Sequence, residues 1–251
     1  MNNSSSQNAL AAGLGLVLFF GLWEAVGRLQ LLGAFFPPLS QIVAYLVAPE
    51  HRALLLSAAT QSAGEACAGY LLGSIAGFAL AVIALLVRPS APGLERLAAI
   101  VNGIPVIAVG SVCAVLFPPD VNPVIVSALA VFFMMFVASN AGFAAATAAH
   151  RELFAVFGAA RSATFWRLQL PAAIPSLVDG LRLSAPVAVV GAIIGEWFAS
   201  ERGLGPLLLN AMQNYQIALL WSAAVLGALV SALAYGALGV AQRCAAERYR
   251  A

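Results

Sequence analysis

Charged residues are absent from long stretches of this 251-residue chain, and these stretches limit what it can fold into. The charge-free runs cover residues 1–23, 66–87, 97–119, 121–149 and 203–242. A helix needs about 20 consecutive apolar residues to cross the hydrocarbon core of a bilayer. In lipid, every backbone polar group must also be hydrogen-bonded within the protein. The runs therefore predict an all-α membrane protein with about six transmembrane helices.

The runs also place the individual helices. We expect them at about residues 9–28, 56–87, 97–117, 122–147, 175–199 and 216–241. The second segment is too long for one straight span, so it is expected to begin in the outer interface. No connecting segment is long enough for a soluble catalytic domain, so residues 1–251 are expected to form a single transmembrane domain.

The composition excludes several other classes of protein. Hydrophobic residues make up 62% of the chain and charged residues 9%, whereas a soluble domain is about 25% charged. This excludes an ordinary soluble domain, a disordered chain and a nucleic-acid-binding protein. The cysteines Cys67, Cys113 and Cys244 are expected to be small buried hydrophobic residues. His51 and His150 lie in different loops, so no catalytic, metal or cofactor site is expected, and the chain is not predicted to be an enzyme.

Arginine fixes the predicted orientation, because cytoplasmic loops are enriched in basic residues. With six helices and an inside N-terminus, nine arginines face the cytoplasm and three, Arg28, Arg52 and Arg202, face outward. The nine are Arg88, Arg96, Arg151, Arg161, Arg167, Arg182, Arg243, Arg248 and Arg250. Both termini are therefore expected in the cytoplasm, in a multi-pass protein of the plasma membrane.

Small residues and prolines recur within the expected spans. Glycines at spacings of four residues form one stripe on the second span and another on the fifth, which predicts close contacts between helices. The stripes are Gly69, Gly73 and Gly77, and Gly191 and Gly195. Such a face serves either static packing or sliding during a conformational change, and both interpretations stay open here. Pro105 and Pro186 are expected to kink their helices.

A few polar groups lie in or near the spans, where a charge is costly and faces protein or water. Glu65 has two open interpretations, a structural polar partner or a role in a solute path, and the same choice is open for Glu196. The candidate path residues are Glu65, Asn102, Asn140, Glu196 and Trp197. No pair of intramembrane ionisable groups indicative of a proton relay is evident.

The segment at about residues 148–174 is predicted to be a helix, a break at Gly158, a short helix, and a proline that opens the next span. The short helix would expose Phe165 and Trp166 beside Arg161 and Arg167. Aromatic side chains are costly to leave in water, so this surface is expected to meet either the lipid headgroups or a soluble partner.

This segment resembles the EAA loop of binding-protein-dependent ABC importer permeases. Glu152 stands six residues before Gly158, and Leu170-Pro171 ends thirteen residues after it. Further segments resemble the nitrate/sulfonate/taurine branch: Pro37-Pro38-Leu39-Ser40-Gln41, residues 171–175, Gly180-Leu181-Arg182, Gly195-Glu196 and Gly203-Leu204-Gly205. The chain departs from the pattern at Leu153 and Phe154, where the family has alanines, and Glu65 is closer to pyrimidine-type members.

The resemblance implies a type I ABC importer-like transmembrane domain that forms the translocation path for a small nutrient. Implied partners are an ATP-binding cassette ATPase, an extracytoplasmic solute-binding protein and a second permease chain, identical or related. ATP would bind to the ATPase, and this chain would need no cofactor. The implied coupling residues are Glu152, Gly158, Arg161, Phe165, Trp166, Arg167 and Pro171. A stand-alone secondary transporter or channel is the alternative, and the choice between a pyrimidine-like solute and a sulfonate or nitrate stays open.

Overall fold

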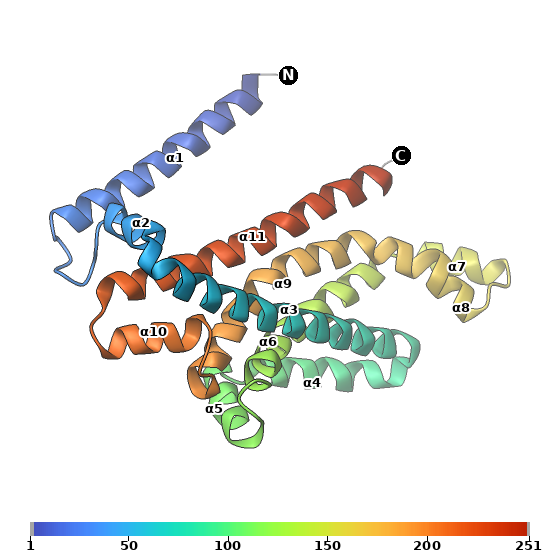
Figure 1. The fold of residues 1–251 in the computed structure, drawn as a ribbon. Coiled ribbons are helices and arrows are strands. Elements are labelled where there is room, and N and C mark those ends of the chain that lie inside the picture. The colour runs from blue at the N-terminus through green and yellow to red at the C-terminus, as the bar shows by residue number, and fades with distance from the viewer. Residues whose placement is uncertain (1–2, 250–251) are drawn as a thin grey trace. The chain divides into compact units, whose positions relative to one another are not determined.

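The computed structural model describes residues 3–249, and every regular element in this range is a helix (Figure 1). In the described part of the chain, five helices are long and apolar enough to cross a membrane, and a sharply bent pair of shorter helices brings the number to six if the pair is one broken span. The prediction of an all-α chain with about six spans is therefore confirmed. The chain divides into two compact units: one runs to Ser57 and includes Leu207–Leu226, and the other comprises Ala58–Pro206 and the residues from Gly227.

The first unit contains α1 (Asn3–Arg28), α2 (Leu39–Val47), the start of α3 (Pro49–Leu86), most of α10 (Leu204–Gln213) and the start of α11 (Ile217–Tyr249). Three aromatic rings form a cluster, since the ring centroids of Trp23, Phe36 and Trp221 lie 5.2 to 5.5 Å apart. Both indole N–H groups donate to backbone carbonyls, of Pro37 at 3.2 Å and Phe35 at 2.9 Å. Apolar rings with a satisfied polar edge are typical of the membrane–water interface.

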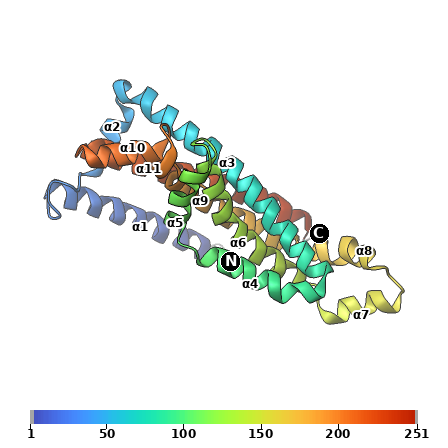
Figure 2. The same ribbon diagram turned by 90° about the horizontal axis from the view of Figure 1, so that it is seen from below.

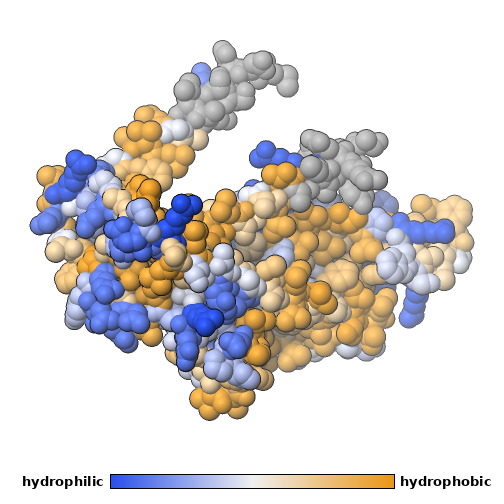
Figure 3. All heavy atoms as spheres, in the orientation of Figure 1, coloured by the Kyte–Doolittle hydropathy of each residue, from blue (hydrophilic) through white to orange (hydrophobic). Residues whose placement is uncertain are grey.

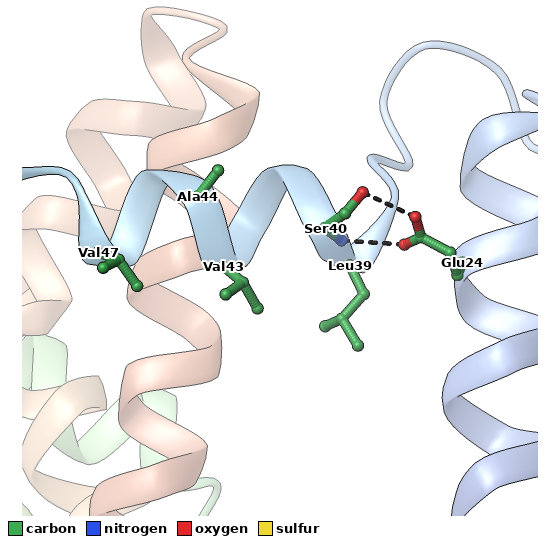
Figure 4. Close-up of a pocket in the computed structure, with 6 residues that line it drawn as sticks. All are labelled: Glu24, Leu39, Ser40, Val43, Ala44 and Val47. Carbon is green, nitrogen blue, oxygen red and sulfur yellow. Dashed lines mark hydrogen bonds between the residues drawn. The ribbon is translucent and has the colours of Figure 1, made fainter.

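Glu24 of α1 caps the start of α2. Its carboxylate accepts hydrogen bonds from the Ser40 backbone N–H at 2.9 Å and the Ser40 hydroxyl at 2.7 Å (Figure 4). The first N–H groups of a helix have no partner within the helix, so an anion placed there stabilises them. Arg28 also donates to this carboxylate. Glu24 thus fixes how the chain enters α2.

The second unit is a bundle in which α6 (Asn122–Ala144) packs against both α3 and α9 (Leu170–Ala199) (Figures 1 and 2). The glycine stripes make these contacts. A Cβ atom added at Gly69, Gly73 or Gly77 of α3 would lie 2.3 to 2.4 Å from atoms of α6. Gly191 and Gly195 of α9 meet α6 in the same way, at 2.8 and 2.6 Å. The predicted close contacts through small residues are confirmed.

The order of these contacts gives the direction of each helix. Along α3, successive glycines meet successively later residues of α6, so α3 and α6 run parallel. Along α9, Gly180 meets Ala138 whereas Gly195 meets Pro123, so α9 runs antiparallel to α6. The start of α6 and the end of α9 therefore lie at one end of this bundle. The connection between α6 and α9 lies at the other, which we call the loop end.

The expected helix at 97–117 is wrong, because two helices stand in its place. α4 (Ala91–Gly103), preceded by a short turn η1 (Arg88–Ser90), and α5 (Val106–Leu116) meet at an angle of 88°. Pro105 has no N–H to donate and disfavours helical geometry in the residue before it. Ile104 accordingly has an extended ψ of 125°. Pro175 and Pro186, in contrast, lie inside α9 without ending it.

The expectation for the cysteines holds only in part. Cys113 is buried, whereas Cys67 is exposed on α3, so it is not a buried residue as expected. The side chain of Cys244 lies outside the described part of the structure. Cys67 lines a cavity among apolar side chains of α3, α9 and α11. Elsewhere α3 exposes Leu71 and Ile75, and apolar side chains cover much of the face shown in Figure 3. An exposed apolar surface of this kind is expected where helices face lipid.

Candidate functional site

Glu196 lies near the end of α9 and is completely buried. Its Oε2 atom accepts a hydrogen bond of 2.6 Å from the backbone N–H of Gly205, in the first turn of α10. The neighbouring N–H of Leu204 donates to the Ser62 hydroxyl of α3 at 2.8 Å. Two orphan N–H groups at the start of α10 are thereby satisfied from α9 and α3, which fixes the turn that precedes α10.

The turn before α10 needs glycine at two positions, because a larger residue would collide with Glu196 and because one position has a positive φ. Gly203 has a φ of +113°, and an added Cβ would lie 2.5 Å from the Glu196 carboxyl group. At Gly205 an added Cβ would lie 2.5 Å from the Glu196 Cβ atom. The motif Gly195-Glu196 with Gly203-Leu204-Gly205, noted in the sequence, is therefore one structural unit in which the glycines admit the buried carboxyl group.

Replacing Glu196 with alanine is expected to lower the free energy of unfolding by about 3 kcal/mol, through a cavity and an unsatisfied Gly205 N–H. Glu196→Gln retains an acceptor of similar shape and is expected to keep most of this stability. The measurement is thermal unfolding of the purified protein in detergent. Glu201→Ala, in the same turn but exposed, is the control. Equal melting temperatures for Glu196→Ala and Glu201→Ala would contradict the assigned role.

Glu65 of α3 is 8% exposed. Its Oε1 atom accepts a hydrogen bond of 2.7 Å from the side-chain amide of Gln61. The carboxyl groups of Glu65 and Glu196 also interact with each other. Their remaining oxygens, Glu65 Oε2 and Glu196 Oε1, are buried and have no hydrogen-bond partner. Two buried acceptors therefore lie together at this site, and they satisfy each other only when one of the two carboxyl groups carries a proton.

A cavity with a volume of about 460 Å³ opens beside Glu65. Its lining comes from α3, the α5–α6 connection and the α9–α10 turn, and consists of Gln61, Glu65, Pro119, Asp120, Ser200, Glu201 and Arg202. It lies at the end of the bundle away from the loop end, because Gly69, one turn beyond Glu65, contacts Ser127 and Val124 near the start of α6. We call this cavity the acidic pocket, since it carries three carboxyl groups and one guanidinium.

The other predicted path residues do not line the acidic pocket. Asn102 is exposed on α4, Asn140 is half-buried on α6, and Trp197 is 40% exposed on α9. Of the five candidates, the structure brings only Glu65 and Glu196 together. Sequence reasoning missed Ser62, Asp120, Glu201 and Arg202. The charged ones directly flank the apolar runs, and this is the signal that could have found them.

The segment at the loop end begins with α7 (Ala148–Val156), which extends beyond the bundle (Figures 1 and 2). The Thr147 hydroxyl accepts from the His150 N–H and caps its start. Gly158 follows with a φ of +69°, a conformation that favours glycine. α8 (Arg161–Thr164) and a π-helical turn η2 (Phe165–Gln169) then lead into α9. The predicted break at Gly158 is confirmed, and Pro171 lies in the first turn of α9.

Phe165 is not exposed as predicted. It is buried, and its ring centroid lies 6.0 Å from that of Phe143 of α6. Both aromatic side chains were expected to be exposed, but consecutive residues of a helix point about 100° apart, and here Phe165 faces α6. Phe165 thus anchors the segment to the bundle, and Trp166 points outward with 65% exposure.

Four apolar side chains on this segment are strongly exposed, and we call them the loop patch: Leu153, Val156, Phe157 and Trp166. Phe157 is 79% exposed and Val156 is 83% exposed. Among the predicted coupling residues, Glu152, Arg161, Arg167 and Pro171 are also exposed. Exposed apolar side chains flanked by charge are typical of a surface that is covered by a partner.

Near the loop end, α9 and α11 are joined through polar side chains. The Arg182 guanidinium lies 4.1 Å from the centroid of the Tyr235 ring and donates to Gln242 at 2.7 Å. Gln242 in turn donates to Asp179. The Gly180-Leu181-Arg182 motif therefore connects two spans. Among residues 3–249, no three His, Cys, Asp or Glu side chains could together hold a metal ion.

The geometry can be compared with known proteins. Residues 69–250 match the family described as "binding-protein-dependent transport system inner membrane component". The chain belongs to this family. It is an ABC importer permease, a multi-pass subunit of the bacterial inner membrane through which substrate is translocated. Members of this family are transport subunits, and membership implies an ATPase and a solute-binding protein as partners.

Individual relatives agree with this assignment. The chain is 27% identical over 215 residues to a probable ABC transporter permease protein of Haemophilus influenzae, covering 85% of this chain and 87% of that one. It is 37% identical over 103 residues, 41% of each chain, to the formylaminopyrimidine transport permease protein ThiX of Halalkalibacterium halodurans. An inward-facing structure of the MetNI methionine ABC transporter covers 79% of this permease and 99% of that chain, with a TM-score of 0.66 and 15% identity. That match shows the type I importer fold.

Proposed function

We propose that this permease imports a small organic nutrient, that its loop end faces the cytoplasm, and that the loop patch docks on the ATPase. The observation that carries the proposal is the loop patch itself. It lies on both sides of the Gly158 break, at the end of α7 and on the π-helical turn η2, and it is anchored through buried Phe165. An exposed apolar surface that is anchored in this way can transmit the movement of a bound partner to the spans, because the anchor keeps the surface fixed relative to α9.

The charges support the orientation. Arg88, Arg151, Arg161 and Arg167 lie at or next to the loop end, whereas the acidic pocket at the opposite end carries Asp120, Glu201 and a single arginine, Arg202. Cytoplasmic loops carry the excess of basic residues. The acidic pocket then faces the periplasm, where a solute-binding protein delivers its cargo. Under this proposal ATP binds to the ATPase alone, and a second permease chain, identical or related, completes the path.

The relatives support an organic solute. They include permeases named for formylaminopyrimidine, aliphatic sulfonates and riboflavin transport. We propose a nitrogen-containing heterocyclic nutrient in preference to a sulfonate, because the carboxyl groups of the acidic pocket disfavour an anion. The position of Glu65 in that pocket carries this preference.

The proposal is tested by extracting the permease gently from its native membrane and identifying co-purified proteins by mass spectrometry. An ATPase subunit that co-purifies, with ATP-dependent solute uptake after reconstitution, is the expected result. A permease recovered alone that still moves solute into vesicles without ATP would overturn the proposal and favour a secondary transporter.

A further inference from the structure

Arg182 is a cation within a span rather than in a connection. Gly180, two residues before it on α9, contacts Ala138 of α6, which comes six residues before the last residue of that helix. At a rise of 1.5 Å per residue, Arg182 therefore lies about 12 Å inside the end of α6. It belongs to a membrane span, not to a cytoplasmic connection as the arginine count assumed. A guanidinium at this depth needs partners within the protein.

The partners of the Arg182 guanidinium lie on α11. The centroid of the Tyr235 ring is 4.1 Å away, and Nη1 donates a hydrogen bond of 2.7 Å to Gln242 Oε1. Gly239, between these two residues, leaves room for the cation, because an added Cβ would lie 3.1 Å from Arg182 Cζ. In this structure Arg182 therefore holds α9 against α11.

A second partner for Arg182 lies on its own helix. Asp179 is exposed and precedes Arg182 by three residues, a spacing at which two side chains meet on a helix face. Gln242 stands between them here, since it accepts from Arg182 and donates to Asp179. Among the described residues, the buried Arg182 Nε has no hydrogen-bond partner. If α11 withdrew, Gln242 would leave with it, and Arg182 and Asp179 could pair directly.

α9 packs closely on α6 but loosely on α11. Cβ atoms added at Gly180 and Gly195 would lie 2.4 and 2.6 Å from atoms of α6, so these two helices are expected to move as one unit. Between α3, α9 and α11, in contrast, lies a cavity of about 280 Å³ that is lined largely by alanines. Its lining includes Ala185, about one turn beyond Arg182. The polar contacts of Arg182 therefore tie α11 to α9 where close packing does not.

We infer that Arg182 is a positioning residue of the transport cycle. It joins α11 to α9 in the state described here, and it exchanges Gln242 for Asp179 when the two helices separate. Both arrangements give the cation a charge-assisted hydrogen bond, so a differential contact elsewhere decides between them. The inference rests on the proposed function, since the movement comes from an ATPase docked on the loop patch and reaches α9 through η2.

The test uses the permease with its co-purified ATPase in lipid nanodiscs and needs no solute. Cys67 lines the cavity beside α11, so the rate at which N-ethylmaleimide labels this thiol reports the separation of α9 and α11. Cys113 and Cys244 are replaced by alanine, and labelling is compared without nucleotide and with ATP and vanadate. We expect labelling to be about tenfold faster with ATP and vanadate, because α11 withdraws from the cavity.

Substitutions on the two helices are expected to act in opposite directions. Gln242→Leu and Gly239→Ala weaken the hold of Arg182 on α11, so labelling becomes fast even without nucleotide. Asp179→Asn weakens the second arrangement, so labelling stays slow with ATP and vanadate. Arg243→Gln, exposed on α11 next to Gln242, is the matched control and is expected to respond as the parent does. A purely structural network would lower thermal stability in all three variants without shifting the labelling in opposite directions.

Two results would overturn the inference: labelling of Cys67 that does not respond to nucleotide, or a shift in the same direction for Asp179→Asn and Gln242→Leu. Thermal unfolding and phosphate release by the ATPase are measured on the same samples. A complex that hydrolyses ATP without the expected shifts keeps the proposed function and loses the inference. A permease that retains no ATPase loses both.

Discussion

The substitution Gly73→Ala is expected to lower the free energy of unfolding of the permease by about 1–3 kcal/mol. An added Cβ would lie 2.3 Å from the carbonyl oxygen of Ala128 and 2.9 Å from the Cβ atom of Val131. The nearest obstacle is backbone, which cannot rotate away as a flexible side chain can. α3 and α6 must therefore move apart, and the close packing that holds helices together in lipid is lost.

Gly64 of the same helix is the matched control. An added Cβ there meets no atom within 4 Å, so Gly64→Ala makes the same chemical change without a clash. Thermal unfolding of both variants in detergent, followed by fluorescence or by aggregation, measures the difference. If Gly73→Ala and Gly64→Ala unfold at the same temperature, the close contact between α3 and α6 does not contribute to stability as argued.

This pair of variants also separates the two interpretations of the glycine stripe. If the stripe serves static packing, uptake by Gly73→Ala falls only in proportion to the amount of folded protein. If the α3–α6 face slides during transport, uptake per folded molecule falls as well, because an added Cβ must pass the α6 backbone. The contact distances favour static packing, since Gly69, Gly73 and Gly77, the three glycines of the stripe, are all enclosed by α6.

The spans could be predicted because lipid imposes a simple rule on sequence. A bilayer core excludes charge, so runs without charged residues locate α1, α3, α6 and α11 to within several residues. α9 has only a shorter run of this kind, residues 183–195. The break at Pro105 could not be predicted in the same way. α4 and α5 are both apolar, and a proline tells only that a helix can bend. The angle of 88° depends on how the two pieces pack, which composition does not encode.

The candidate site was partly predictable for a related reason. Glu65 and Glu196 were conspicuous because they lie in or beside apolar runs. They are 131 residues apart, and only the antiparallel arrangement of α9 and α6 beside α3 brings them together. Asp120 and Glu201 lie in connections, where a charge is ordinary. Flanking an apolar run marks them only as charges beside a span, because their position near Glu65 depends on tertiary structure.

At the loop end, Phe157→Asp and Trp166→Asp are expected to abolish association with the ATPase while leaving the permease folded. Both side chains are exposed, at 79% and 65%, so a carboxylate there remains hydrated and disturbs no internal contact. In a docked complex the same carboxylate would be buried in an apolar contact without a partner. Residues of this kind often dominate interface energy, and each is expected to weaken the complex by about 2 kcal/mol or more.

The measurement is the amount of ATPase that co-purifies with each permease variant, together with ATP-dependent uptake in proteoliposomes. His150→Asp is the matched control, because it places the same charge at an exposed position at the start of α7, outside the loop patch. It is expected to retain the ATPase, since a negative charge is favourable at a helix N-terminus. Retention of the ATPase by Phe157→Asp and Trp166→Asp would show that the loop patch lies against lipid headgroups instead.

Substitutions of Phe165 and Trp166 are expected to have opposite effects: the first lowers the stability of the fold, and the second removes ATPase binding alone. Phe165 is 8% exposed and packs on Phe143, so Phe165→Ala is expected to cost about 3–5 kcal/mol of stability. A loss of ATPase in that variant would follow from a displaced segment. Trp166→Ala, in contrast, leaves the fold intact and removes only the contact surface. The coupling surface is therefore defined by variants that lose the ATPase without losing thermal stability, and Trp166 and Phe157 meet that condition whereas Phe165 does not.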